Sequence, residues 1–167
     1  LKYLIKKDLD VVAPDKIELP KVPSRQIELV EVEELDRLLT VPLQQVQGKP
    51  ITLRGFRDKA ILELLFSTGL RLAELCKLDR YLNFDRGEVT VRGKGEKLRL
   101  VFVSETAQQA IKNYLAKRPD TEDKLFISLD KKGRVVGPIT PRSVQRMVSF
   151  YSRKAGLTQR LTPHGLR

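Results

Sequence analysis

Four cationic side chains stand where a polypeptide can present charge to a phosphate group. Arg71 follows Gly69, which is suited to ending a helix, and Lys94 lies at the tip of an expected two-glycine hairpin. His164 and Arg167 are three residues apart at an expected helix start, so they share one face at its positive end. This set suits metal-free attack on a phosphodiester. The arginines would bind the non-bridging oxygens, the histidine would donate to the developing charge and the lysine would protonate the leaving oxygen.

Each side chain also has a simpler interpretation. Arg71 and Lys94, taken singly, are most simply solvated charges, and His164 at a helix start is most simply a cap or a packing residue. Both interpretations stay open until the order and context of these residues are considered.

Composition excludes several other chemistries. Cys76 and His164 are the only residues of their types, so the chain cannot assemble the usual zinc sites built from cysteines and histidines. It has no P-loop, Gly-x-Gly-x-x-Gly, Gly-x-Ser-x-Gly or His-Glu-x-x-His motif, and we expect no metal and no cofactor. Cys76 fits a small buried apolar residue, and an unpaired cysteine suits the cytoplasm. No apolar run is long enough to span a bilayer, so we expect no membrane partner.

The charge balance favours a polyanionic partner. The 167 residues include 32 Lys and Arg against 21 Asp and Glu, a formal net charge of +11. Residues 1–50 carry 8 basic and 9 acidic side chains, whereas residues 51–167 carry 24 and 12, a net charge of +12. The polyanion-binding surface is therefore expected in the second part.

The chain divides into a short leading piece, a linker and one domain. Residues 1–9 read as an amphipathic helix, and Pro14, Pro20 and Pro23 then break any regular pattern. We expect a helical remnant over residues 1–13, a linker over residues 14–30 and a single domain over residues 31–167.

The domain is expected to be mainly helical. Apolar spacing predicts helices over residues 32–39, 56–67, 71–78 and 141–154, and a further helix that begins after its cap residue, Ser104. Alternating residues predict strands over 88–92 and 98–103, joined by a turn at 93–96, and a short third strand over 125–128. The fold class is α+β, with a small antiparallel sheet of about three strands.

The helix over residues 141–154 has two contrasting faces. Thr140-Pro141 is a helix-start signal, and the apolar face holds Val144, Met147, Val148 and Tyr151. The opposite face holds Arg142, Arg146 and Arg153. Such a basic face is either simply solvated or in contact with a polyanion.

Three segments, in this order, resemble the boxes of one enzyme family. Residues 68–75 (TGLRLAEL), 93–97 (GKGEK) and 162–167 (TPHGLR) resemble the first arginine box, the hairpin lysine and the start of the His-x-x-Arg box of tyrosine recombinases, the phage-integrase and Xer family. The resemblance covers about residues 31–167. The leading segment is similar to the end of that family's core-binding domain and its linker.

The resemblance implies a role for each site residue. Arg71 and Arg167 would bind the scissile phosphate of DNA, Lys94 would be the general acid, and His164 a hydrogen-bond donor or proton carrier. Glu74 would hold Arg71, with a simple helix salt bridge as the alternative. The family lays the helix that matches residues 141–154 against double-stranded DNA, which would give Arg142, Arg146 and Arg153 phosphate or base contacts.

One part of the family pattern is absent. The nucleophilic tyrosine of the family follows the His-x-x-Arg box, whereas Tyr3, Tyr81, Tyr114 and Tyr151 all precede His164. Tyr151 falls in an apolar stripe and is interpreted as core. We therefore expect a catalytic domain truncated before its nucleophile, which binds DNA weakly and does not cleave it.

The parent enzyme would cut and rejoin DNA through a 3′-phosphotyrosine intermediate and would act together with other recombinase protomers. Two alternatives stay open: a non-catalytic DNA-binding regulatory module, and an enzyme like the type IB topoisomerases.

Overall fold

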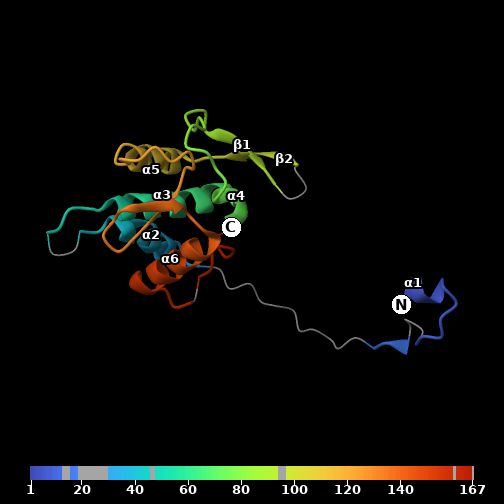
Figure 1. Cartoon of the computed structure of the whole chain (residues 1–167). Helices are drawn as coiled ribbons and strands as arrows, with labels where there is room; N and C mark the ends of the chain where they lie inside the picture. The colour runs from blue at the N-terminus through green and yellow to red at the C-terminus, as the bar shows by residue number, and fades with distance from the viewer. Residues whose placement is uncertain (13–15, 19–29, 46–47, 94–96, 160, 167) are drawn as a thin grey trace.

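The computed structural model describes residues 1–12, 16–18, 30–45, 48–93, 97–159 and 161–166 (Figure 1). Its elements in chain order are α1 (Lys2–Ile5), α2 (Val32–Thr40), the 3-10 helix η2 (Val41–Leu43), α3 (Leu53–Thr68), α4 (Leu72–Leu75), β1 (Glu88–Arg92), β2 (Leu98–Phe102), α5 (Glu105–Leu115), β3 (Ile127–Leu129), β4 (Val135–Pro138) and α6 (Pro141–Lys154). No residue of α1 is buried, and Leu38 is the first fully buried apolar side chain among the described residues. The boundaries at residues 13 and 30 stay a prediction.

Helix α3 forms the centre of the core. It contacts α5, η2 and α2, and Figure 1 shows α5 above it and α2 below. The helix begins where the Thr52 side chain accepts a hydrogen bond from the Gly55 N–H, so it starts earlier than the expected residue 56. A Cβ at Gly55 would lie 2.7 Å from the Pro42 carbonyl oxygen, so glycine permits the close approach of η2. Gly69, at φ 58°, ends α3 in the left-handed conformation, as predicted.

The outer helices confirm most of the expected caps and faces. Ser104 accepts a hydrogen bond from the Ala107 N–H at the start of α5, and Thr140 accepts one from the Ser143 N–H at the start of α6. The apolar face of α6 is buried as expected. At the first residue of α2, Val32 is 75% exposed, because the helix has not yet reached the core there. Helix α4 is also shorter than the expected 71–78.

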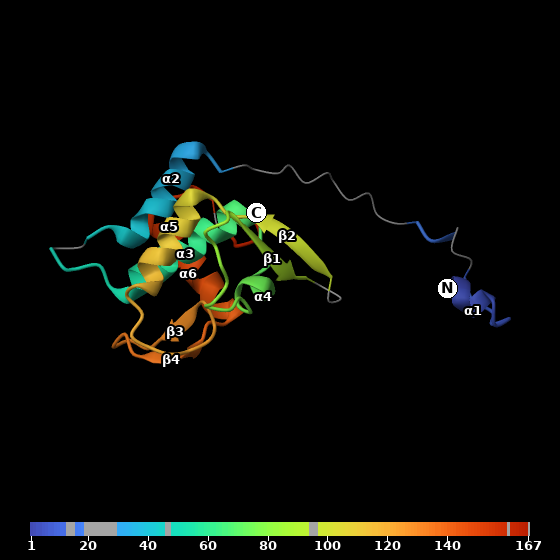
Figure 2. The same cartoon turned by 90° about the horizontal axis from the view of Figure 1, so that it is seen from above.

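The antiparallel strands form two sheets rather than one. Strands β1 and β2 pair with Val91 opposite Arg99, as the predicted hairpin requires. The expected third strand lies at Ile127–Leu129 and pairs with β4, not with the first hairpin. Figure 2 shows the two hairpins well apart. The α+β class is confirmed, and the single three-stranded sheet is corrected to two two-stranded sheets among the described residues.

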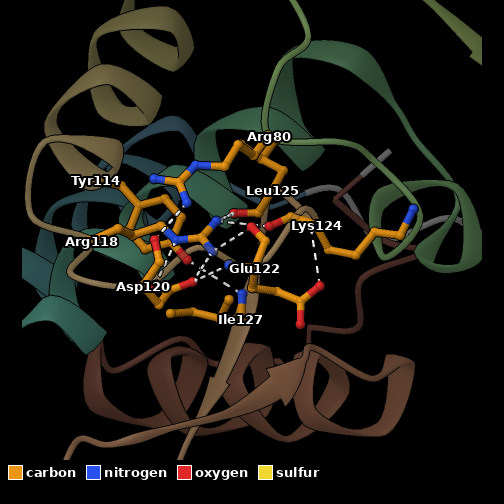
Figure 3. A network of polar contacts seen from close by, with 8 residues as sticks. All are labelled: Arg80, Tyr114, Arg118, Asp120, Glu122, Lys124, Leu125 and Ile127. Atoms are coloured by element: carbon orange, nitrogen blue, oxygen red, sulfur yellow. Dashed lines mark hydrogen bonds and ion pairs between the residues drawn. The ribbon is translucent and has the colours of Figure 1, made fainter.

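A fully buried guanidinium organises the connection between α5 and β3 (Figure 3). Arg118 forms an ion pair with Asp120 and donates hydrogen bonds to the carbonyls of Glu122, Lys124 and Leu125. The ring of Tyr114 lies 5.8 Å from the guanidinium carbon. This arginine therefore holds the segment between α5 and β3 in place and does not contribute to a DNA-binding surface.

In the described part of the chain, no helix is both long and apolar enough to cross a membrane. Cys76 is half-buried, and burial raises the pKa of its thiol to about 11. The thiol is therefore protonated at neutral pH, which agrees with its interpretation as a packing residue.

A candidate phosphate-binding site

Arg71 lies at the sharp turn between α3 and α4. Gly69 ends the first helix in the left-handed conformation, Leu70 is buried, and Arg71 is the extended N-cap residue of α4. The turn fixes the backbone on both sides of the arginine, and the Arg71 side chain remains 53% exposed. A fixed backbone and an open guanidinium are what a phosphate ligand requires.

The buried carboxylate of Glu74 holds Arg71 in two ways. Its Oε2 accepts a hydrogen bond of 2.8 Å from the Arg71 backbone N–H, and its Oε1 accepts one of 3.0 Å from the Arg71 guanidinium. The first bond satisfies a donor at the start of α4, and the second restrains the side chain. The expected contact between Glu74 and Arg71 is therefore present, and its role in binding phosphate stays a prediction.

Arg99, on β2, is a third member of this cluster that sequence reasoning missed. Its Nη2 lies 2.6 Å from Glu74 Oε2, so one carboxylate is shared by two guanidinium groups. The signal in the sequence was the single charged residue in an otherwise apolar strand, between Leu98 and Leu100.

The shared contacts keep Glu74 ionised. Burial alone would raise its pKa, but hydrogen bonds from the Arg71 backbone and from the Arg99 and Arg71 guanidinium groups hold that pKa below its usual value. The carboxylate is therefore charged at neutral pH, and the cluster of two arginines and one glutamate carries a net positive charge.

The base of the β1–β2 hairpin touches the same carboxylate. A Cβ at Gly93 would lie 3.4 Å from Glu74 Oε1, and the Gly93 N–H donates to the Lys97 carbonyl at 2.8 Å. The hairpin is therefore anchored beside Arg71. Lys94, the expected general acid, follows Gly93 in the sequence and lies outside the described residues, as does Arg167.

The segment that carries His164 is held from both sides. Leu161 and Leu166 are buried in the core, and the backbone N–H of Leu166 donates to the Thr162 carbonyl, closing one helical turn. His164 is exposed on this turn. In both views the red C-terminal turn lies near the C-terminal end of α3, which Arg71 follows in the sequence (Figures 1 and 2). Among the described residues, no hydrogen bond or ion pair joins His164 to Arg71.

The three arginines of α6 lie on its exposed face, as predicted. Arg142, Arg146 and Arg153 are all exposed, and only the last has a hydrogen bond within the described structure, from its Nε to the Ser149 carbonyl. Arg146 and Arg54 line a surface hollow between α3, β3 and α6. Helix α6 contacts α4, which begins immediately after Arg71.

The buried tyrosines are structural. The Tyr151 hydroxyl donates to Asp58 Oδ2 at 3.1 Å, and burial raises the pKa of this phenol. Burial also raises the pKa of Asp58, whose Oδ1 accepts two hydrogen bonds from Arg57. Burial likewise raises the pKa of Tyr114 to about 12. Both tyrosines are buried and their hydroxyl groups are hydrogen-bonded, which confirms the interpretation of Tyr151 as core.

Within the described ranges, no three His, Cys, Asp or Glu side chains are grouped so that they could hold a metal ion.

Known proteins are similar to this chain in sequence and in fold. The model of the phage integrase family matches residues 29–167. A tyrosine recombinase XerC from Myxococcus xanthus is 36% identical over 178 residues, covering 99% of this chain and 55% of the relative. A tyrosine recombinase XerA from Pyrococcus furiosus is 36% identical over 155 residues, covering 92% and 50%.

Solved structures agree. The crystal structure of XerA recombinase has a TM-score of 0.67 at 28% identity, covering 98% of this chain and 54% of that one. The Tn1549 transposon integrase, solved with transposon right end DNA, has a TM-score of 0.71 at 18% identity, covering 99% and 59%, and supports the fold alone. The chain thus spans about half the length of the relatives it matches. The family model matches most of the chain, and the chain also has the expected arginine turn and hairpin. It therefore belongs to the phage integrase family, the family of the tyrosine recombinases.

Proposed function

We propose that this chain is a DNA-binding part of the catalytic region of a site-specific tyrosine recombinase. The observation that carries the proposal is the Arg71 turn, where a half-exposed guanidinium is fixed by a buried, ionised glutamate. A restrained arginine beside a net positive cluster is suited to one phosphate of a DNA backbone.

The proposed chemistry needs no metal. Arg71 and Arg167 bind the non-bridging oxygens of the scissile phosphate, and His164 donates a hydrogen bond to the charge that develops there. A tyrosine hydroxyl attacks phosphorus and releases its proton to solvent, the bond to the 5′ oxygen breaks, and Lys94 protonates that leaving oxygen. The 3′-phosphotyrosine conserves the bond energy, and attack by a 5′ hydroxyl reverses the step and rejoins the strand.

The tyrosine in this scheme is not one of the four in the sequence. All four precede His164, whereas the nucleophile of the family follows the His-x-x-Arg box. Tyr114 and Tyr151 are in addition buried and hydrogen-bonded. We infer that the 167 residues bind DNA without cutting it, so supercoiled plasmid incubated with the chain stays uncut.

The exposed face of α6 supplies the rest of the proposed DNA interface. Arg142, Arg146 and Arg153 would contact phosphates or base edges, which extends the interface beyond the single phosphate at Arg71. The Tn1549 integrase and the XerH recombinase, which share this fold, were solved with DNA, and we infer a duplex partner for this chain as well. Other recombinase protomers as partners, and a cytoplasmic location, belong to the same proposal.

The proposal is tested by duplex binding, measured as fluorescence anisotropy across a salt series. The affinity should fall steeply with salt, and Arg71→Ala should weaken binding about tenfold, the value of one charge-assisted contact. Arg134→Gln is the matched control, because Arg134 also pairs with a carboxylate but lies on the β3–β4 hairpin rather than on the Arg71 turn or on α6. An affinity that does not change with salt, or equal losses in the two variants, would contradict the proposal.

A further inference from the structure

Strand β2 has an inverted pattern of side chains. Leu98, Leu100 and Phe102 are exposed, the last to 71%, whereas Arg99 points to the same side as the buried Val101. In the register of the hairpin, Arg99 lies opposite Val91, which is also buried. An arginine therefore occupies a position where its neighbours on the sheet are valines, and this position needs an explanation.

The inward direction brings the guanidinium to Glu74. Arg99 Nη2 lies 2.6 Å from Oε2, the same oxygen that accepts the Arg71 backbone N–H at 2.8 Å. The Arg71 guanidinium occupies the other oxygen at 3.0 Å. Glu74 therefore joins an arginine from the hairpin to the backbone and the side chain of an arginine from the helix turn.

Stability alone is a poor reason for this arrangement. Among the described residues, Arg99 Nε is the one buried side-chain nitrogen or oxygen without a hydrogen-bond partner. An unpaired buried donor costs folding free energy, and buried ion pairs are often no more stabilising than apolar residues of similar volume. A valine, as at the neighbouring inward positions, would fill a strand of this kind without that cost.

The charge of the cluster gives a better reason. Glu74 paired with Arg71 alone would form a neutral pair and would attract a phosphate weakly. A second guanidinium on the same carboxylate restores one net positive charge, so Glu74 can restrain Arg71 without neutralising the site.

We propose that Arg99 is a positioning residue of the phosphate-binding site, which acts through Glu74 to fix the Arg71 guanidinium beside the hairpin that carries Lys94. The inference rests on the proposed function, since it assumes that Arg71 binds a DNA phosphate. Arg99 itself does not touch the DNA in this account.

A double-mutant cycle on duplex binding tests this role. Arg99→Gln should weaken binding about fivefold, less than the roughly tenfold loss of Arg71→Ala, and should reduce the salt slope with it. In the Arg71→Ala background, Arg99→Gln should weaken binding clearly less than it does in the wild type, because the guanidinium that Arg99 positions is already absent. Arg99→Lys retains the ion pair with Glu74 and should bind within about twofold of the wild type.

The outcomes separate the inference from the proposed function. If Arg71→Ala binds like Arg134→Gln, the proposed function fails. If Arg71→Ala weakens binding but Arg99→Gln matches Arg134→Gln in both backgrounds, only the positioning role fails.

Equal losses from Arg99→Gln in both backgrounds would also overturn the positioning role, because they would indicate an independent DNA contact or a general structural defect. Circular dichroism checks that each variant folds. If Arg99→Gln does not fold, Arg99→Met makes the same comparison with a long apolar side chain.

Discussion

Replacing Glu74 by alanine removes three hydrogen bonds from one buried carboxylate. The bond from the Arg71 backbone caps the start of α4 and is worth about 1 kcal/mol. The pair with the half-exposed Arg71 guanidinium is screened by solvent and adds about 0.5 kcal/mol. The bond from Arg99, whose side chain is 35% exposed, adds about 1 kcal/mol.

We therefore expect Glu74→Ala to lose about 2–3 kcal/mol of unfolding free energy, a large share of the total for a domain of this size. Urea denaturation followed by circular dichroism measures the loss. Glu33→Ala is the matched control, because Glu33 is an exposed acidic residue in the first turn of α2 and its loss should change stability by about 0.5 kcal/mol or less. Equal stabilities of the two variants would refute the energetic role assigned to Glu74.

Two further predictions concern the parts of the fold that support the site. Tyr151→Phe removes the hydrogen bond to Asp58 and should lower the unfolding free energy by about 1–2 kcal/mol, while DNA affinity stays unchanged. For Asp120, the hydrogen bond from Arg118 holds the carboxyl pKa below its ordinary value of 3.8. The pair makes its whole contribution to the unfolding free energy above that value and loses it as the pH falls through the lower folded-state pKa. The difference in unfolding free energy between the wild type and Asp120→Asn should therefore narrow in acid.

Both predictions can fail clearly. A Tyr151→Phe variant that loses DNA binding while it remains folded would contradict the structural role of this phenol. Urea denaturation between pH 7 and pH 3 tests the second prediction, and a difference that stays constant or widens in acid would contradict the role of the Arg118–Asp120 pair.

Much of the fold follows from local sequence signals. Ser104 and Thr140 begin their helices as predicted, because a side-chain oxygen that accepts a backbone N–H acts within one turn. The first hairpin was predictable because its alternating residues and glycine turn lie close together in the sequence. Strand β4 was not, since Val135–Pro138 is short and contains both glycine and proline, which are uncommon in strands.

The candidate site was predictable only in part. Arg71 and Glu74 lie three residues apart on one helix start, so their contact could be expected from the sequence. The contact between Glu74 and Arg99 joins residues 25 positions apart and depends on which face of β2 turns inward. That face was hard to infer, because the exposed side of the strand is the more apolar one. The net charge also includes Arg57 and Arg118, although both are buried in structural ion pairs and add no charge to the surface.

The central claim is that Arg71 and the turn that carries His164 bind one phosphate of a DNA duplex. The most direct measurement is a crystal structure of the chain bound to a short duplex. The account predicts a backbone phosphate within hydrogen-bond distance of the Arg71 guanidinium, with Glu74 and Arg99 still paired behind it. A duplex bound elsewhere on the domain, with Arg71 facing solvent, would contradict it.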